Sequence, residues 1–189
     1  MKNTEAFKIF KKKLYNEVKL LLRFYASLIR IKDEIHGYLH DKIGRTTYVD
    51  LLILLKAAEN DIIIRLAKLD DNTKNTVSFQ KLLHILPSTN ENKTELKDSV
   101  MKFSTCFNDL KQQRRNQELA HLNKDSVDNE LNINIDLRPH IINLLKIMDV
   151  LFDEDLKYPW SDGAYEKYDL KVFFKSTLGT LTYPANNFS

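Results

Sequence analysis

The residues best suited to chemistry form one short segment, Arg114-Arg115-Asn116-Gln117-Glu118-Leu119-Ala120-His121. An arginine guanidinium keeps its positive charge in a protein, whereas a histidine imidazole exchanges protons near neutral pH. Arg115 and His121 therefore combine a fixed positive charge with a proton carrier, and the Asn116 amide lies beside the arginine. This combination suits reactions at a phosphodiester, in which a proton must move and negative charge must be stabilised.

A long amphipathic helix, predicted from about Thr94 to about His121, must position this segment. Its apolar residues recur at intervals of four, three, four and three, as in a helix packed along one seam: Leu96, Val100, Phe103, Phe107 and Leu110. The same seam continues to Arg114, Gln117 and His121, so the apolar stripe turns polar in its last two turns. Functional sites often break a packing pattern in this way, although a helix end that reaches solvent would do the same.

Apolar periodicity and capping residues predict the other helices. Thr46 or Thr47 and Ser78 are suitable N-caps, and Asp136 before Leu137-Arg138-Pro139 marks another helix start. The expected helices cover residues about 4–39, 46–69 and 79–86, a helix from about 137 that Pro159 breaks, and a short last helix at about 169–178.

Composition favours a single helical domain. The chain has 189 residues but only four Gly and four Pro, which leaves long uninterrupted runs of helix-forming residues. We therefore expect an all-α protein with about five to six helices in one domain over residues 1–189, with a frayed tail at about residues 180–189.

Several other classes of protein and site are disfavoured. The single cysteine, Cys106, excludes an intrachain disulfide and is expected to be a small buried hydrophobe rather than a reactive thiol. His36 and His40 have metal-ligand spacing but lack a convincing third ligand, so we expect neither a metal nor a cofactor. The most apolar window, residues 51–69, carries charges such as Lys56 and Glu59 that oppose membrane insertion.

The amino-terminal residues and the net charge give two further indications. Met1-Lys2-Asn3-Thr4-Glu5 lacks the apolar core of a signal peptide, so we expect a cytoplasmic protein. The net charge of +3 permits contact with a polyanion but falls short of a strongly basic nucleic-acid-binding arm.

Two segments resemble HEPN proteins. The segment from Arg115 to His121, with five residues between the two, resembles the Arg-Asn-x-x-x-Ala-His form of the HEPN ribonuclease motif. Ile64-Arg65-Leu66-Ala67-Lys68-Leu69-Asp70, followed by Val77-Ser78-Phe79-Gln80-Lys81-Leu82-Leu83, resembles the corresponding region of AbiU2-type HEPN proteins of abortive infection and toxin systems. The resemblance covers roughly residues 45–150.

The resemblance implies an up-and-down helical bundle that forms a homodimer, in which the Arg and His residues of two subunits meet at one composite site. It further implies metal-independent cleavage of RNA, with Arg115, His121 and Asn116 as catalytic residues. Arg114, Lys111 and Lys124 are the cationic residues nearest to these three and are expected to bind the RNA. An antitoxin or other neutralising protein is a further partner that the family suggests. Many family members have a tyrosine two residues after the histidine, but this chain has Asn123, so silencing by modification of that tyrosine is not expected.

Helix geometry fits a composite site. On an ideal helix, an offset of six residues turns about 600°, which leaves Arg115 and His121 about 120° apart and about 9 Å apart along the axis. One helix would therefore not pair them, whereas a second copy across a two-fold axis could place each histidine near the partner's arginine, and Ala120 would permit close approach. Arg114 lies on nearly the same face as His121 and is a rival for the catalytic arginine.

Two alternatives to catalysis stay open. A dimeric HEPN-like module could bind a nucleotide, RNA or a partner protein without cutting anything. The segment could also be a solvated helix end, at which His121 complements the negative end of the helix dipole.

Overall fold

The computed structural model describes the backbone of residues 2–38, 44–73, 76–87, 91–122, 136–152, 156–160 and 168–171. Within these ranges, the side chains of residues 2–4, 34, 36–38, 45, 113–122, 160 and 168 lie outside the description.

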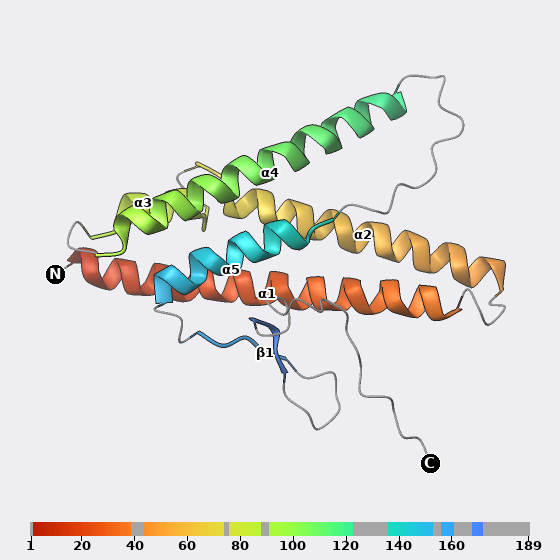
Figure 1. Ribbon diagram of the computed structural model, residues 1–189, viewed down its shortest axis with the longest axis horizontal. Coiled ribbons are helices and arrows are strands. Elements are labelled where there is room, and N and C mark those ends of the chain that lie inside the picture. The colour runs from red at the N-terminus through yellow and green to blue at the C-terminus, as the bar shows by residue number, and fades with distance from the viewer. Residues whose placement is uncertain are drawn as a thin grey trace, which may run out of the picture. The chain divides into compact units, whose positions relative to one another are not determined.

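Helices make up most of the described chain (Figure 1), and the all-α class is confirmed. The five helices of the described ranges are α1 (Lys2–Tyr38), α2 (Arg45–Leu69), α3 (Phe79–Ile85), α4 (Lys93–Leu122) and α5 (Arg138–Phe152). Two short strands, β1 (Pro159–Trp160) and β2 (Tyr168–Asp169), pair in antiparallel fashion and were not expected from the sequence. None of the described helices is long and apolar enough to cross a membrane.

The carboxyl-terminal part differs from the expectation in two places. Helix α5 ends at Phe152, well before Pro159, which instead lies in β1. The Lys11 ammonium donates to the Leu151 carbonyl at 2.7 Å and the Asn92 amide donates to the Val150 carbonyl at 3.4 Å. These bonds satisfy two of the carbonyls that the end of a helix leaves without an intrahelical partner.

The expected last helix begins one residue late. Asp169 lies in β2, and helical backbone starts at Leu170. The Asp169 carboxylate accepts from the backbone N–H groups of Tyr158 and Lys171, both at 3.0 Å, so the same side chain closes the strand pair and caps the following turn. The rest of the expected helix and the tail at residues 180–189 lie outside the described residues.

The chain divides into two compact units. Unit 1 contains residues 1–19 and 63–156, and unit 2 contains residues 20–62 and 157–189. The Arg-His segment and the helices α3, α4 and α5 belong to unit 1.

The core of unit 1 forms along the predicted seam of α4, which is confirmed. The seam residues are all buried: Leu96, Val100, Phe103, Phe107 and Leu110. The Phe103 ring meets the Phe79 ring of α3 edge-on at 5.3 Å and stacks on the Phe107 ring at 6.0 Å. Helix α5 runs antiparallel to α4, because His140 near its start contacts Phe107 while Val150 near its end bonds to Asn92 just before α4.

Unit 2 has its own core, formed by the second half of α1, most of α2 and the strand pair. Its buried residues include Leu21, Leu22, Tyr25, Leu55, Ile62, Tyr158 and Leu170. One carboxylate lies among these apolar residues. Glu59 is fully buried, and its Oε2 accepts from Lys56 Nζ at 3.0 Å.

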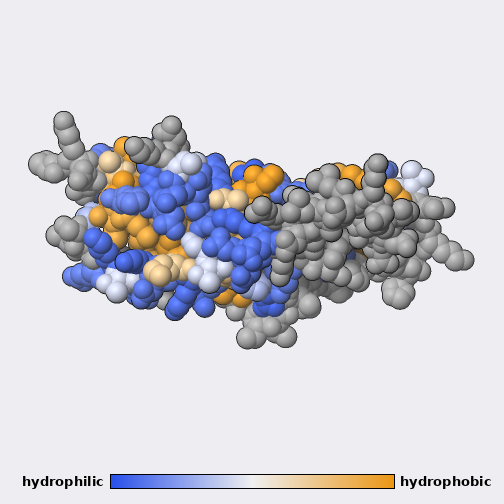
Figure 2. All heavy atoms as spheres, turned by 90° about the horizontal axis from the view of Figure 1, so that it is seen from above, coloured by the Kyte–Doolittle hydropathy of each residue, from blue (hydrophilic) through white to orange (hydrophobic). Residues whose placement is uncertain are grey.

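Figure 2 shows one face of the molecule, on which charged and polar side chains surround smaller apolar areas.

Truncation of Phe103 should test the seam. We expect Phe103→Ala to lower the free energy of unfolding by about 3–5 kcal/mol, because it removes a buried ring and leaves a cavity. Met101 lies on the same helix but is 57% exposed, so Met101→Ala should cost less than about 0.5 kcal/mol. Denaturant unfolding of the two variants measures both values, and similar losses would contradict this assignment of the core.

Candidate functional site

The backbone of α4 continues as a helix through the whole Arg-His segment and ends at Leu122. The predicted catalytic residues Arg115, Asn116 and His121 therefore lie on helical turns, as does Arg114. Their side chains lie outside the described residues, as does the whole of Lys124.

Helix α5 covers the seam of α4 only up to the start of this segment. The His140 ring, in the first turn of α5, meets the Phe107 ring edge-on at 6.0 Å. Because the two helices are antiparallel, α5 begins opposite this part of α4, whereas α4 extends fifteen residues beyond Phe107, or about 22 Å. Figure 1 shows the end of α4 projecting past the start of α5. Within the described part of unit 1, the Arg-His turns thus follow the stretch that α5 packs against.

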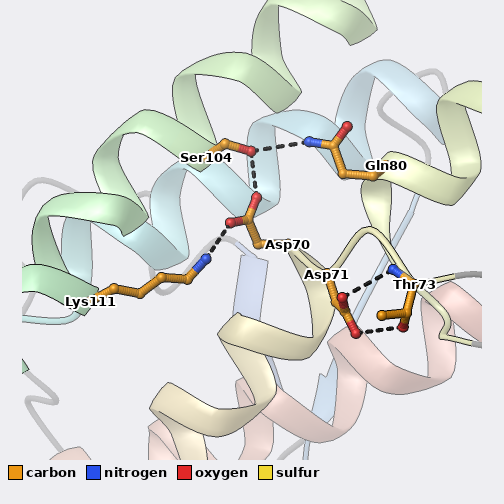
Figure 3. Close-up of polar contacts among 6 residues, drawn as sticks. All are labelled: Asp70, Asp71, Thr73, Gln80, Ser104 and Lys111. Carbon is orange, nitrogen blue, oxygen red and sulfur yellow. Dashed lines mark hydrogen bonds and ion pairs between the residues drawn. The ribbon is translucent and has the colours of Figure 1, made fainter. Parts of the chain in front are cut away.

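A buried carboxylate ties α4 to the end of α2 one turn before the segment (Figure 3). The Asp70 side chain is only 7% exposed. Its carboxylate accepts a hydrogen bond from the Ser104 hydroxyl and forms an ion pair with Lys111 Nζ at 2.7 Å. The Gln80 amide donates to the same Ser104 oxygen at 3.3 Å. The end of α2, α3 and α4 are therefore linked by one polar cluster, which we call the Asp70 cluster: Asp70, Gln80, Ser104 and Lys111.

The local sequence explains why two adjacent aspartates behave differently. The backbone N–H of Asp70 still bonds to the Leu66 carbonyl at 3.1 Å, so Asp70 prolongs the last turn of α2 and its side chain reaches α4. Asp71 instead bonds within its own loop, where it accepts from the Thr73 hydroxyl at 2.7 Å and from the Thr73 N–H at 3.0 Å. The hydrogen bond from the Thr73 hydroxyl is the main reason that the pKa of Asp71 lies below its usual range.

Of the predicted RNA-binding residues, Lys111 is the one whose side chain the structure describes. Its ammonium lies on the Asp70 carboxylate and 4.8 Å from the centre of the Phe107 ring, and its side chain is 43% exposed. An RNA phosphate that contacts Lys111 would therefore share this cation with Asp70 rather than meet an isolated charge.

A second polar contact, between Cys106 and His140, was not found from the sequence. Cys106 is half-buried rather than buried as expected, and its Sγ lies 3.4 Å from His140 Nδ1. Burial lowers the pKa of His140, against the opposite effect of Asp136 and Asp109. The imidazole is therefore uncharged at neutral pH and does not supply the positive charge that stabilises a thiolate.

One sequence signal could have located His140. The Asp136 side chain accepts from the Arg138 N–H at 3.0 Å, which confirms the predicted start of this helix. His140 lies four residues before Leu144 and seven before Ile147, both fully buried, and this is the spacing of one helix face.

The described side chains hold no group of three or more His, Cys, Asp or Glu residues arranged to bind a metal ion. His36 and His40, the pair with metal-ligand spacing, lie outside the described side chains.

Comparison with protein-family models, with curated proteins and with solved structures gives no match for this chain. The two segments that resemble HEPN proteins therefore remain the basis for a functional assignment.

Burial of His140 should make stability depend on pH. Because the folded-state pKa is lowered from 6.5, the unfolded chain binds this proton first as the pH falls below about 6.5. Stability should therefore fall from pH 7.5 to pH 5.5, by at most about 1.4 kcal/mol per pH unit from this one group.

His140→Gln removes this titration and should flatten the decline over the same range. Unfolding in denaturant at several pH values measures the difference between the wild type and the variant. A decline of the same steepness in both proteins would show that His140 does not cause it.

Proposed function

We propose that this protein is a metal-independent endoribonuclease of HEPN type, with a composite Arg-His site at a homodimer interface. The observation that best supports the proposal is the position of the segment, on turns of α4 that continue past the start of α5. The proposal requires a second copy of the same helix to pack against these turns.

The need for a second copy follows from helix geometry. Arg115 and His121 are about 120° apart around an ideal helix and about 9 Å apart along it, too far to act on one phosphate from one helix. A two-fold axis that crosses the two α4 ends would bring the arginine of one chain to the histidine of the other.

The proposed reaction uses the ribose 2′-hydroxyl as the nucleophile. The 2′-oxygen attacks the adjacent phosphorus and the bond to the 5′-oxygen of the next nucleotide breaks, which gives a 2′,3′-cyclic phosphate and a 5′-hydroxyl. His121 moves the proton that leaves the 2′-hydroxyl and must reach the 5′-oxygen. Arg115 stabilises the negative charge on the phosphorane-like transition state, and Asn116 orients the phosphate or the arginine. Arg114, Lys111 and Lys124 supply positive charge for neighbouring phosphates.

The biological role belongs to the same proposal. An HEPN ribonuclease of this kind would act in the cytoplasm in phage defence or as a toxin, with a neutralising protein partner. The main alternative is a dimeric module that binds a nucleotide, RNA or a protein without cleavage, and the cleavage experiment decides between the two.

His121→Ala should abolish cleavage. We expect the wild-type protein to cut single-stranded RNA in the presence of EDTA, and the loss of the proton carrier to lower the rate by at least about a hundredfold. His84→Ala is a matched control, because His84 is an exposed histidine of α3 outside the segment, and it should cut like the wild type. Gel analysis of the products and of their ends measures both. Undiminished cleavage by the His121 variant would rule out the assigned role, and RNA binding without cleavage by the wild type would favour the module.

Mixing two inactive variants should restore activity if the site is shared between chains. In a heterodimer of Arg115→Ala and His121→Ala subunits, one composite site loses both residues and the other keeps both. After random reassociation, half of the dimers are mixed, so the activity should recover to about a quarter of the wild-type value. Arg114→Ala in place of Arg115→Ala tests the rival arginine. No recovery in either mixture would contradict a site shared across the dimer.

A further inference from the structure

We propose that Asp70 is a positioning residue, which holds the Arg-His turns of α4 in place through Ser104 and Lys111. Its effect on catalysis rests on the proposed function, whereas its effect on α4 does not.

The Asp70 contacts lie on a defined row of α4. Ser104 and Lys111 are seven residues apart, so they occupy one face of the helix two turns apart, and both bond to the same carboxylate. On an ideal helix this row continues to Arg115, about 20° from Ser104 and about 6 Å along the axis from Lys111. The apolar seam that α5 covers continues instead to Arg114. Asp70 thus anchors the row of α4 that leads to the preferred catalytic arginine.

The ion pair between Lys111 and Asp70 lies near the carboxyl-terminal end of α4. Leu110 belongs to the buried seam, and the adjacent Lys111 forms an ion pair with Asp70, which follows the end of α2. Beyond them the helix continues for eleven residues to Leu122. A helix opens most readily at its terminal turns, so an attachment at Lys111 limits how far such opening reaches along α4.

The carboxylate is well suited to act as a fixed point. At 7% exposure its charge is mostly removed from water, and such a charge is stable only when its partners are in place. Ser104 and Lys111 supply these partners from a single helix, and Gln80 fixes the Ser104 hydroxyl from α3. Movement of the α4 end away from α2 would therefore leave a buried charge without its partners.

The test compares Asp70→Asn with Asp71→Asn in the full-length protein. Asp71 is the matched control, because it is the adjacent aspartate and its side chain bonds within its own loop. Hydrogen exchange followed by mass spectrometry reads out α4 independently of activity. We expect Asp70→Asn to raise the exchange rate of residues 112–122 roughly tenfold, with little change in α5, and Asp71→Asn to leave both unchanged.

A second variant, Lys111→Gln, tests the same ion pair in case Asp70→Asn does not fold. Lys111→Gln keeps the bond from Ser104 to Asp70 and should raise exchange over the same residues. The double variant Asp70→Asn/Lys111→Gln should add little to either single change, because both remove the same ion pair. Unchanged exchange at residues 112–122 in both single variants would overturn the proposal, and so would an equal rise throughout α4 and α5.

Kinetics then separates the two proposals. If the protein cuts RNA, Asp70→Asn should lower kcat by roughly ten- to a hundredfold, because misplaced catalytic groups slow the chemical step. KM should not rise, because Lys111 no longer pairs with a carboxylate and can bind an RNA phosphate. Cleavage with an unchanged kcat in Asp70→Asn would overturn the positioning role alone. Faster exchange in Asp70→Asn, in a protein that cuts no RNA, would support the anchor and overturn the ribonuclease.

Discussion

Burial of one apolar seam on α4 is the constraint on which the rest of unit 1 depends. Phe103 and Phe107 are fully buried, and their rings contact Phe79 of α3 and His140 of α5. With these rings in place, the rotation of α4 about its axis is fixed. That rotation directs Ser104 and Lys111 toward Asp70, and it sets the turns on which the Arg-His segment lies.

Polar contacts on either side of the seam add specificity that apolar packing lacks. Asp70 accepts from two residues of α4 on one side, and Cys106 meets His140 on the other. Rings can slide past one another at modest cost, whereas a buried carboxylate loses its partners as soon as the register changes. The two contacts therefore favour a single alignment of α4 with its neighbours. The Arg-His segment follows directly after this aligned stretch of helix.

The sequence predicts the features that depend on local physics. Spacing and residue type identify the α4 seam, the Ser78 cap and the start of α5 after Asp136. In the structure, the Ser78 hydroxyl accepts from the Lys81 N–H. Spacing and residue type do not identify the contacts that link elements, because Asp70 is 34 residues from Ser104 and 41 from Lys111, and no periodicity pairs polar residues at such separations. The resemblance to HEPN proteins pointed to Asp70 without indicating what it contacts.

The proposed dimer requires that the α4 ends of two chains meet, so that Arg115 of each chain lies beside His121 of the other. It is tested most directly by the distance between the two copies of residue 121, measured by pulsed electron paramagnetic resonance on spin-labelled His121→Cys protein with Cys106→Ser. We expect one short distance, on the order of 20 Å with both label arms included, because each His121 must lie within reach of a phosphate held by Arg115 of the other chain. A monomer without dipolar coupling, or a dimer whose labels lie on the order of 50 Å apart, would contradict it.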